Sequence, residues 1–153
     1  MEIERKFLIK TLPENLESYP HYHITQAYLC TEPVIRIRQK AEDYILTYKS
    51  KGLLSREEIE MPLTKDSFEH LLTKADGMII EKERYCISLD SEHTIELDIF
   101  ERDFKGLILA EIEFENEETA LAYEMEDWFL KDVTMESAYH NSTMSKGNIP
   151  PFQ

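Results

Sequence analysis

The chain has 153 residues, 42% of them hydrophobic and 31% charged, and a formal net charge of −14 at pH 7. This acidic balance argues against nucleic acid or an anionic membrane as a partner, and the length suits a single core. The start is charged at alternate positions, and the longest stretch without charged residues, 18–31, is too polar to span a bilayer. We therefore expect one cytoplasmic domain over residues 1–153, with a loose tail over about 147–153.

Segments with the two-residue hydrophobic periodicity of strands are interrupted along the chain by segments with helical periodicity. In chain order, the expected elements are strands over 2–9, 23–30, 34–40, 44–51 and 56–61, a helix over 64–75, strands over 78–89, 94–100 and 107–115, a helix over 117–124, and a helical turn near 137–141. The first helix has a cap residue, Thr64, and a glycine stop, Gly77.

The charge pattern on the strands is the most informative feature. Residues two positions apart on a strand share one face, because successive side chains alternate. Charged pairs at this spacing occur on seven strands, several of them like-charged, and most have apolar residues on the other face. They are Glu2/Glu4 with Lys6, Arg36/Arg38, Lys49/Lys51, Glu58/Glu60 with Arg56, Lys82/Arg84, Glu96/Asp98 and Glu111/Glu113. Solvent-facing sheets usually mix their charges, so this arrangement calls for another explanation.

Two architectures suit this pattern. In the first, the charged faces form the outside of a β-sandwich. In the second, the fold is α+β: a closed eight-stranded antiparallel β-barrel, or tunnel, has a charged interior, and flanking helices over 64–75 and 117–124 cover its apolar outer face. Buried charges need partners. A cavity lined by both signs therefore suits a polyanion accompanied by divalent cations, and we prefer this second architecture.

The residue types indicate which chemistry such a cavity supports. Two Glu side chains about 7 Å apart on a strand can converge on one cation, which relieves their mutual repulsion. Oxygen ligands favour Mg²⁺ or Mn²⁺ over zinc. A zinc site is also not expected because Cys30 and Cys86 lack C-x-x-C spacing and a nearby His pair, and the five His residues show no H-x-E or H-E-x-x-H arrangement. Arg and Lys pairs suit phosphate oxygens, so the set is typical of phosphoryl transfer.

At this point the sequence resembles a known family. Glu2-Ile3-Glu4-Arg5-Lys6-Phe7 is similar to the E-x-E-x-K signature of the CYTH domain, the triphosphate tunnel metalloenzymes. The later charged pairs follow in that family's order, and the resemblance runs from Glu2 to about Lys146. It implies an eight-stranded antiparallel tunnel that binds triphosphate-containing small molecules with a divalent metal.

The resemblance also implies roles for the charged residues. The expected metal ligands are Glu2, Glu4 and Glu113, with Glu111, Asp98 and Glu60 nearby for a second ion or the attacking water. The expected phosphate-binding residues are Lys6, Arg36, Arg38, Lys49, Lys82 and Arg84. The expected catalytic group is Glu4, Lys6, Arg38, Glu111 and Glu113. Further site candidates are Tyr28, Lys51, Arg56, Glu58 and Glu96, with Tyr28 equally well interpreted as a core residue.

The short bacterial members of this family that begin E-I-E-R-K-F resemble inorganic tripolyphosphatases, and this chain begins in the same way. We therefore expect a hydrolase, acting as a monomer or homodimer, that releases a terminal phosphate by attack of metal-activated water. The alternatives are a class IV-type adenylate cyclase, a nucleoside or thiamine triphosphatase, and a non-catalytic polyphosphate- or nucleotide-binding module. No insert that would form a dedicated base pocket is visible in the sequence.

Overall fold

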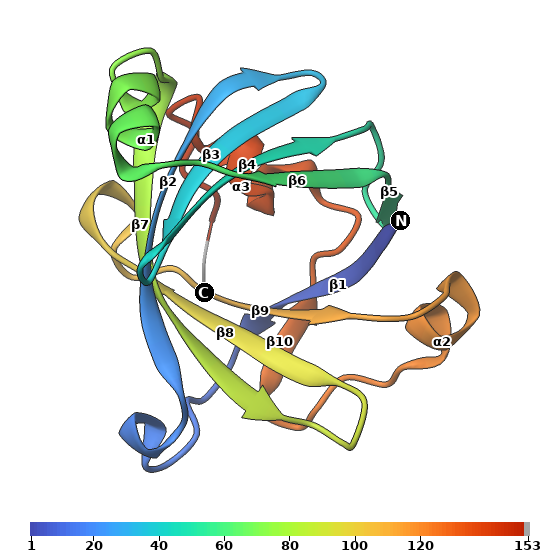
Figure 1. Cartoon of the computed structure of the whole chain (residues 1–153). Coiled ribbons are helices and arrows are strands. Elements are labelled where there is room, and N and C mark those ends of the chain that lie inside the picture. Colours follow the sequence, from blue (N-terminus) through green and yellow to red (C-terminus); the bar gives the residue numbers. More distant parts are fainter. Residues whose placement is uncertain (152–153) are drawn as a thin grey trace.

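The computed structural model describes residues 1–151, which form an antiparallel sheet curled into a nearly closed barrel (Figure 1). Within this part of the chain, nine strands are hydrogen-bonded in the order β10-β1-β9-β8-β7-β2-β3-β4-β6, and the two-residue strand β5 pairs with β1. The strand bounds are β1 Glu2–Ile9, β2 His21–Thr31, β3 Val34–Lys40, β4 Asp43–Lys49, β5 Ser55–Arg56, β6 Glu58–Pro62, β7 Asp76–Ser88, β8 Thr94–Phe100, β9 Ile108–Glu113 and β10 Phe129–Asp132. Because β5 directly precedes β6 in the chain, its pairing with β1 brings the two ends of the sheet together.

The expected α+β fold is confirmed as a barrel-like antiparallel sheet with short helices, whereas the expected number of eight strands is wrong. Two short strands account for the difference. β5 is separated from β6 by one residue, and β10 lies after Asp127, where the sequence pattern predicts no strand. The other strands agree with their predicted ranges to within two residues at either end.

Short helices connect and cover the strands. Their bounds are α1 Lys65–Leu72, α2 Glu117–Ala122 and α3 Asn141–Met144, with 3-10 turns η1 Leu16–Ser18, η2 Arg102–Phe104 and η3 Ser137–Tyr139. As predicted, Thr64 caps α1, and its hydroxyl oxygen accepts a hydrogen bond from the Ser67 N–H at 3.0 Å. The predicted stop at Gly77 is wrong, because α1 ends at Leu72 and Gly77 lies inside β7. Among residues 1–151, no helix has the length and apolar character needed to cross a membrane.

The outward face of the barrel is apolar where helices cover it. Phe68 of α1 belongs to a buried cluster with Ala27 of β2 and Ile37 of β3. Ala120 of α2 belongs to another cluster, with Phe7 of β1 and Phe129 of β10. Because these apolar side chains are buried on the outside, the alternate side chains of the same strands are free to point inward.

The interior of the barrel is charged over only part of its length. Along β1, the inward-facing residues change from Glu4 and Lys6 to Leu8, and along β9 the partner of Leu8 is Leu109, whereas Glu111 pairs with Lys6. Leu8 and Leu109 belong to a buried apolar cluster, which we call the apolar plug. Its other members are Tyr28, Val34, Ile80, Phe100, Phe104, Leu107, Val133, Tyr139 and Met144. The apolar plug fills one end of the barrel and leaves the charged residues around the remaining space.

The C-terminal tail has no regular secondary structure over residues 148–151. Pro150 is buried, and the Pro151 carbonyl accepts a hydrogen bond from the Tyr139 hydroxyl. Residues 152–153 of the tail that we expect to be loose lie outside the described residues.

Gly77 marks a close approach between β7 and the C-terminal segment. Its φ is +84°, and a Cβ added there would lie 2.2 Å from the Ser145 carbonyl oxygen. The neighbouring Met78 donates its backbone N–H to the same oxygen at 2.6 Å. Glycine is therefore required here both by the left-handed backbone and by the space that the Ser145 carbonyl occupies.

We expect Gly77→Ala to lower the free energy of unfolding by about 3 kcal/mol, because backbone strain and displacement of the Ser145 carbonyl both contribute. Gly147→Ala is the matched control. Gly147 has φ +94°, yet the nearest heavy atom to an added Cβ is the Met78 Sδ, at 3.7 Å. Gly147→Ala should therefore lower the free energy of unfolding only by the backbone strain, about 1 kcal/mol. Urea unfolding followed by circular dichroism measures both values, and equal losses would contradict the close approach.

Candidate active site

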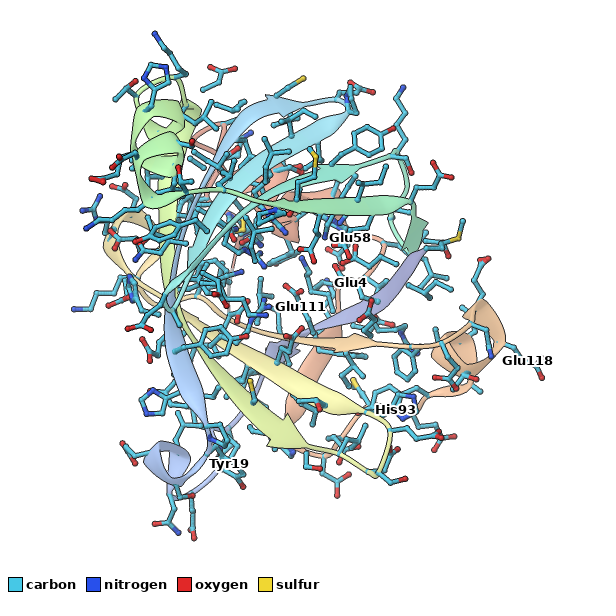
Figure 2. All side chains as sticks on the ribbon, viewed as in Figure 1. Glu4, Tyr19, Glu58, His93, Glu111 and Glu118 are labelled. Carbon is cyan, nitrogen blue, oxygen red and sulfur yellow. The ribbon has the colours of Figure 1, made fainter. Side chains whose placement is uncertain are left out.

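A cavity open to solvent occupies the charged part of the interior. Its empty volume is about 790 Å³, part of it open solvent, which is within the size range of small-molecule sites. The predicted site residues that line it are Glu2, Glu4, Lys6, Tyr28, Arg36, Arg38, Lys49, Arg56, Glu58, Glu60, Lys82, Arg84, Glu96, Glu111 and Glu113. Figure 2 shows Glu4, Glu58 and Glu111 inside the ring of strands, whereas Tyr19, His93 and Glu118 lie at its periphery. The charged faces of the strands therefore point inward, as the barrel architecture requires.

Two predicted site residues lie away from the cavity wall. Lys51 is exposed and pairs with Glu32 at 2.8 Å, contrary to the prediction that it lines the site. The reason is that β4 ends at Lys49, so the alternation that would turn Lys51 inward does not continue. The second residue, Asp98, does not line the cavity either, because it is fully buried against the cations that do.

Asp98 is the counter-ion of two buried cations. Its oxygens accept hydrogen bonds from Arg84 Nε at 2.7 Å and Arg84 Nη2 at 2.8 Å, and the Lys82 Nζ lies 2.8 Å away. Burial by itself would raise the pKa of Asp98, but Arg84 and Lys82 outweigh it and hold this pKa below its ordinary value. Both oxygens of the Asp98 carboxylate are therefore already engaged by donors from the protein.

Glu4 and Glu113 form the bare acidic part of the wall. They are directly paired across β1 and β9, an arrangement in which like charges repel. Burial and the neighbouring Glu111 and Glu2 raise the pKa of Glu4 to about 7, and burial with Glu2 and Glu58 raises the pKa of Glu113. The nearest cation contact of Glu4 is the Arg56 Nη2, at 3.9 Å.

The other two glutamates of these strands are compensated by lysines. Glu2 lies 2.9 Å from the Lys49 Nζ, and Glu111 lies 3.6 Å from the Lys6 Nζ. Although burial opposes it, Lys49 lowers the pKa of Glu2, and Lys6 with Arg84 holds the pKa of Glu111 well below its usual value. In the acidic wall, the carboxylates of Glu2 and Glu111 are thus ionised and paired with lysines, whereas those of Glu4 and Glu113 have little compensating positive charge nearby.

The acidic wall fits a divalent cation by its charge and its all-oxygen donors. A cation beside Glu4 and Glu113 would relieve the repulsion that raises the pKa values of these two residues. Residues 1–151 contain no group of three or more His, Cys, Asp or Glu side chains that is already arranged to hold a metal ion. A cation would therefore have to draw the carboxylates together.

Arg36 and Arg38 form the opposite, basic part of the wall. Among the described residues, Arg36 bonds the Thr47 hydroxyl at 3.2 Å and Arg38 bonds the Gln26 side-chain oxygen at 2.8 Å, and neither has a carboxylate within 4.0 Å. Within residues 1–151, the buried Arg36 Nε has no hydrogen-bond partner. Burial and the nearby guanidinium groups of Arg36 and Arg84 lower the pKa of Arg38 to about 10. Two cations without counter-ions in one wall favour an anionic ligand.

The sequence pattern misses several lining residues: Val34, Lys40, His140, Asn141 and Ser142. Lys40 continues the alternation of Arg36 and Arg38, so extending the pattern by one step would have found it. His140 and its neighbours come from the start of α3, where no periodicity indicates which way a side chain points. Burial and the charge of Lys6 lower the pKa of His140 to about 4, which leaves the ring neutral beside Lys6.

The fold and the cavity together define a class of protein. A barrel whose interior sets unpaired guanidinium groups against bare carboxylates is suited to bind a compact polyanion together with a cation. The chain belongs to the CYTH domain family, whose model matches residues 1–147. The match extends over all ten strands and agrees with the resemblance seen in the charged pairs.

Similar proteins of known activity cover nearly the whole chain. The inorganic triphosphatase of Nitrosomonas europaea is 37% identical over 148 residues, which are 94% of this chain and 96% of that protein. The inorganic triphosphatase of Acetivibrio thermocellus is 29% identical over 158 residues, with 99% and 97% of the two chains covered. A crystal structure of an inorganic triphosphatase has a TM-score of 0.72 and 33% identity, and the match covers 99% of this chain and 97% of that one.

Proposed function

We propose that this protein is a divalent-metal-dependent inorganic triphosphatase that releases the terminal phosphate of tripolyphosphate. The observation that carries the proposal is a division of the cavity wall. Among residues 1–151, Arg36 and Arg38 lack acidic partners, whereas Glu4 and Glu113 lack close cations. Such a wall is complementary to a dense anion accompanied by a metal cation. The activity of the two curated relatives supports inorganic triphosphate as the substrate.

The carboxylates divide into metal ligands and supporting residues. We assign Glu2, Glu4 and Glu113 to the principal Mg²⁺ or Mn²⁺ ion, and Glu111 and Glu60 to a second ion or the attacking water. When bound, the metal neutralises these carboxylates and polarises phosphoryl oxygens and water. Asp98, a ligand candidate from the family resemblance, is reassigned to holding Lys82 and Arg84, because donors from these two residues contact its oxygens.

The cations bind and orient the triphosphate. Arg36 and Arg38 are the strongest candidates, since a phosphate oxygen would supply the counter-charge that they lack. Lys6, Lys49, Lys82 and Arg84 complete the cradle from the neighbouring strands. These four are already held by carboxylates, so their ammonium and guanidinium groups are positioned before the substrate arrives.

Hydrolysis adds water across the terminal phosphoanhydride bond. The water oxygen bonds to the terminal phosphorus, the bond from that phosphorus to the bridging oxygen breaks, and its electron pair leaves with pyrophosphate. The carboxylates of Glu4, Glu111 and Glu113 orient the water, and Glu4, whose pKa is raised to about 7, accepts the proton that the attacking water loses. The cradle stabilises the negative charge that develops on the leaving oxygen.

A substrate panel tests the proposed function. Tripolyphosphate, ATP, thiamine triphosphate and long-chain polyphosphate are incubated with Mg²⁺, with Mn²⁺ or with EDTA, and both orthophosphate and cyclic AMP are measured. We expect orthophosphate release to be fastest from tripolyphosphate and to be abolished by EDTA, without cyclic AMP formation. Cyclic AMP from ATP would favour a cyclase instead, and the absence of release from every compound would indicate a binding module.

Arg38→Ala should raise KM for tripolyphosphate about 10- to 100-fold and change kcat little, because a charge-assisted hydrogen bond of about 1.5–3 kcal/mol is lost in the ground state. Arg102→Gln is the control, since Arg102 is exposed on η2 and pairs with Glu81 outside the cavity. Steady-state kinetics separate the two constants. A lower kcat with KM unchanged would show that Arg38 acts in the transition state instead.

A further inference from the structure

The C-terminal segment contributes a buried amide to the cavity wall. Asn141, the first residue of α3, is only 8% exposed and lines the cavity. In Figure 1, α3 appears within the outline of the ring of strands, and hydrogen bonds place Asn141 against β2 and β7. The same segment carries Tyr139 and Met144 into the apolar plug. Asn141 therefore stands at the boundary between the apolar plug and the charged cavity.

Asn141 is the centre of a chain of hydrogen bonds that joins two phosphate-binding candidates. Its Oδ1 accepts from the Lys82 Nζ at 3.0 Å and from the Gln26 Nε2 at 2.7 Å. The Gln26 Oε1 in turn accepts from the Arg38 Nε at 2.8 Å. The chain thus runs from Lys82 through two neutral amides to Arg38.

The direction of both amides is determined from the two ends. An arginine Nε–H can only donate, and so can the ammonium form of Lys82, which Asp98 favours from 2.8 Å although burial lowers the pKa of Lys82 to about 7. The Asn141 atom that faces Lys82 must therefore be its oxygen, and the Gln26 atom that faces Arg38 must also be an oxygen. These two requirements agree, because they leave the Gln26 amide N–H to donate to Asn141 Oδ1.

This orientation leaves the Asn141 Nδ2 without a partner in the described part of the chain. Within residues 1–151, Nδ2 is also not among the fully buried polar atoms that lack a hydrogen bond, and Asn141 lines the cavity. We propose that the Asn141 side-chain amide donates a hydrogen bond to a phosphate oxygen of bound triphosphate. The inference rests on the proposed function and adds to it a neutral contact beside Lys82 and Arg38.

The presence of an amide rather than a carboxylate at position 141 supports this role. A carboxylate at position 141 would accept from Lys82 and Gln26 equally well, but it would present a second acceptor and a negative charge to the ligand. Lys82 does not need that charge, because Asp98 lies 2.8 Å from its Nζ. An amide satisfies both protein donors and still offers N–H groups to an anion.

Asn141→Asp tests the proposal, because it retains the acceptor for Lys82 and Gln26 but replaces the donor that faces the cavity with a negatively charged acceptor. Asn148→Asp is the matched control, since it adds the same charge to an exposed residue of the same tail. Calorimetric titration with tripolyphosphate in EDTA measures binding without turnover. We expect the Kd of Asn141→Asp to rise at least tenfold, with its Tm unchanged, and the Kd of Asn148→Asp to match that of the unaltered protein.

A Kd for folded Asn141→Asp within threefold of the unaltered value would overturn the proposal and leave the proposed function intact. A second measurement uses the unaltered protein and does not depend on the variant folding. The side-chain N–H resonances of Asn141, identified in ¹⁵N-labelled protein, should shift on addition of tripolyphosphate, and unchanged resonances at saturation would also overturn the proposal. Failure of the unaltered protein to bind or hydrolyse tripolyphosphate would overturn the proposed function itself, and this inference with it.

Discussion

Glu4→Gln is expected to lower kcat for tripolyphosphate hydrolysis by about 10³-fold and to leave the barrel folded. Glutamine has the shape of glutamate but lacks its charge, so it neither holds a divalent cation nor accepts a proton. The variant should be at least as stable as the unaltered protein, because burial and the repulsion from Glu111 and Glu2 that raise the pKa of Glu4 are relieved. Orthophosphate release and Tm, measured on the same preparation, check both expectations.

Glu118→Gln is the control for this experiment, since Glu118 is an exposed glutamate of α2 that lies at the periphery of the barrel (Figure 2). Its kcat should match that of the unaltered protein. If Glu4→Gln retained more than a tenth of the activity, Glu4 would not be a catalytic residue. A fall in activity accompanied by a fall in Tm would instead show a structural role.

Asp98→Asn should produce the largest loss of stability, about 3–5 kcal/mol, because it leaves two buried cations without their shared counter-charge. Arg84 now directs two N–H groups at the Asp98 oxygens, and Lys82 directs its ammonium at one of them. An asparagine would place an NH₂ group opposite at least one of these donors. Urea unfolding monitored by circular dichroism measures the difference in free energy.

The control is Asp103→Asn on the exposed turn η2, which should change the free energy of unfolding by no more than about 0.5 kcal/mol. A loss of less than about 1 kcal/mol in Asp98→Asn would mean that water or Glu111 can take over the role of Asp98. In that case the donors from Arg84 and Lys82 would no longer argue against Asp98 as a metal ligand.

Strand alternation made most of the cavity wall predictable. Glu2, Glu4 and Lys6 share a face of β1, and their inward direction follows once the sheet closes. The prediction succeeded because the direction of alternate side chains depends only on the local backbone. It failed at Lys51, where the strand ends two residues earlier, since the end of a strand depends on its pairing partner.

Other features could not be read from local pattern. Glu96 and Asp98 carry the same charge and share one face of β8, yet Glu96 lines the cavity and Asp98 is buried against Lys82 and Arg84. The difference arises from the position of β8 relative to β7, and the alternation of side chains along one strand does not predict that position. Asn141 was missed for a similar reason, because its place in the wall depends on the packing of the C-terminal segment against β2 and β7.

The sequence by itself determined that acidic and basic pairs occupy single faces of successive strands, and from this the class of ligand followed. The tertiary structure decided that these faces enclose a cavity, that the apolar plug closes one end of it, and which charges remain without partners. The reason is physical: the direction of a side chain on a strand is a local property, whereas the partner of a buried charge is chosen by contacts between residues as distant as Lys49 and Glu2.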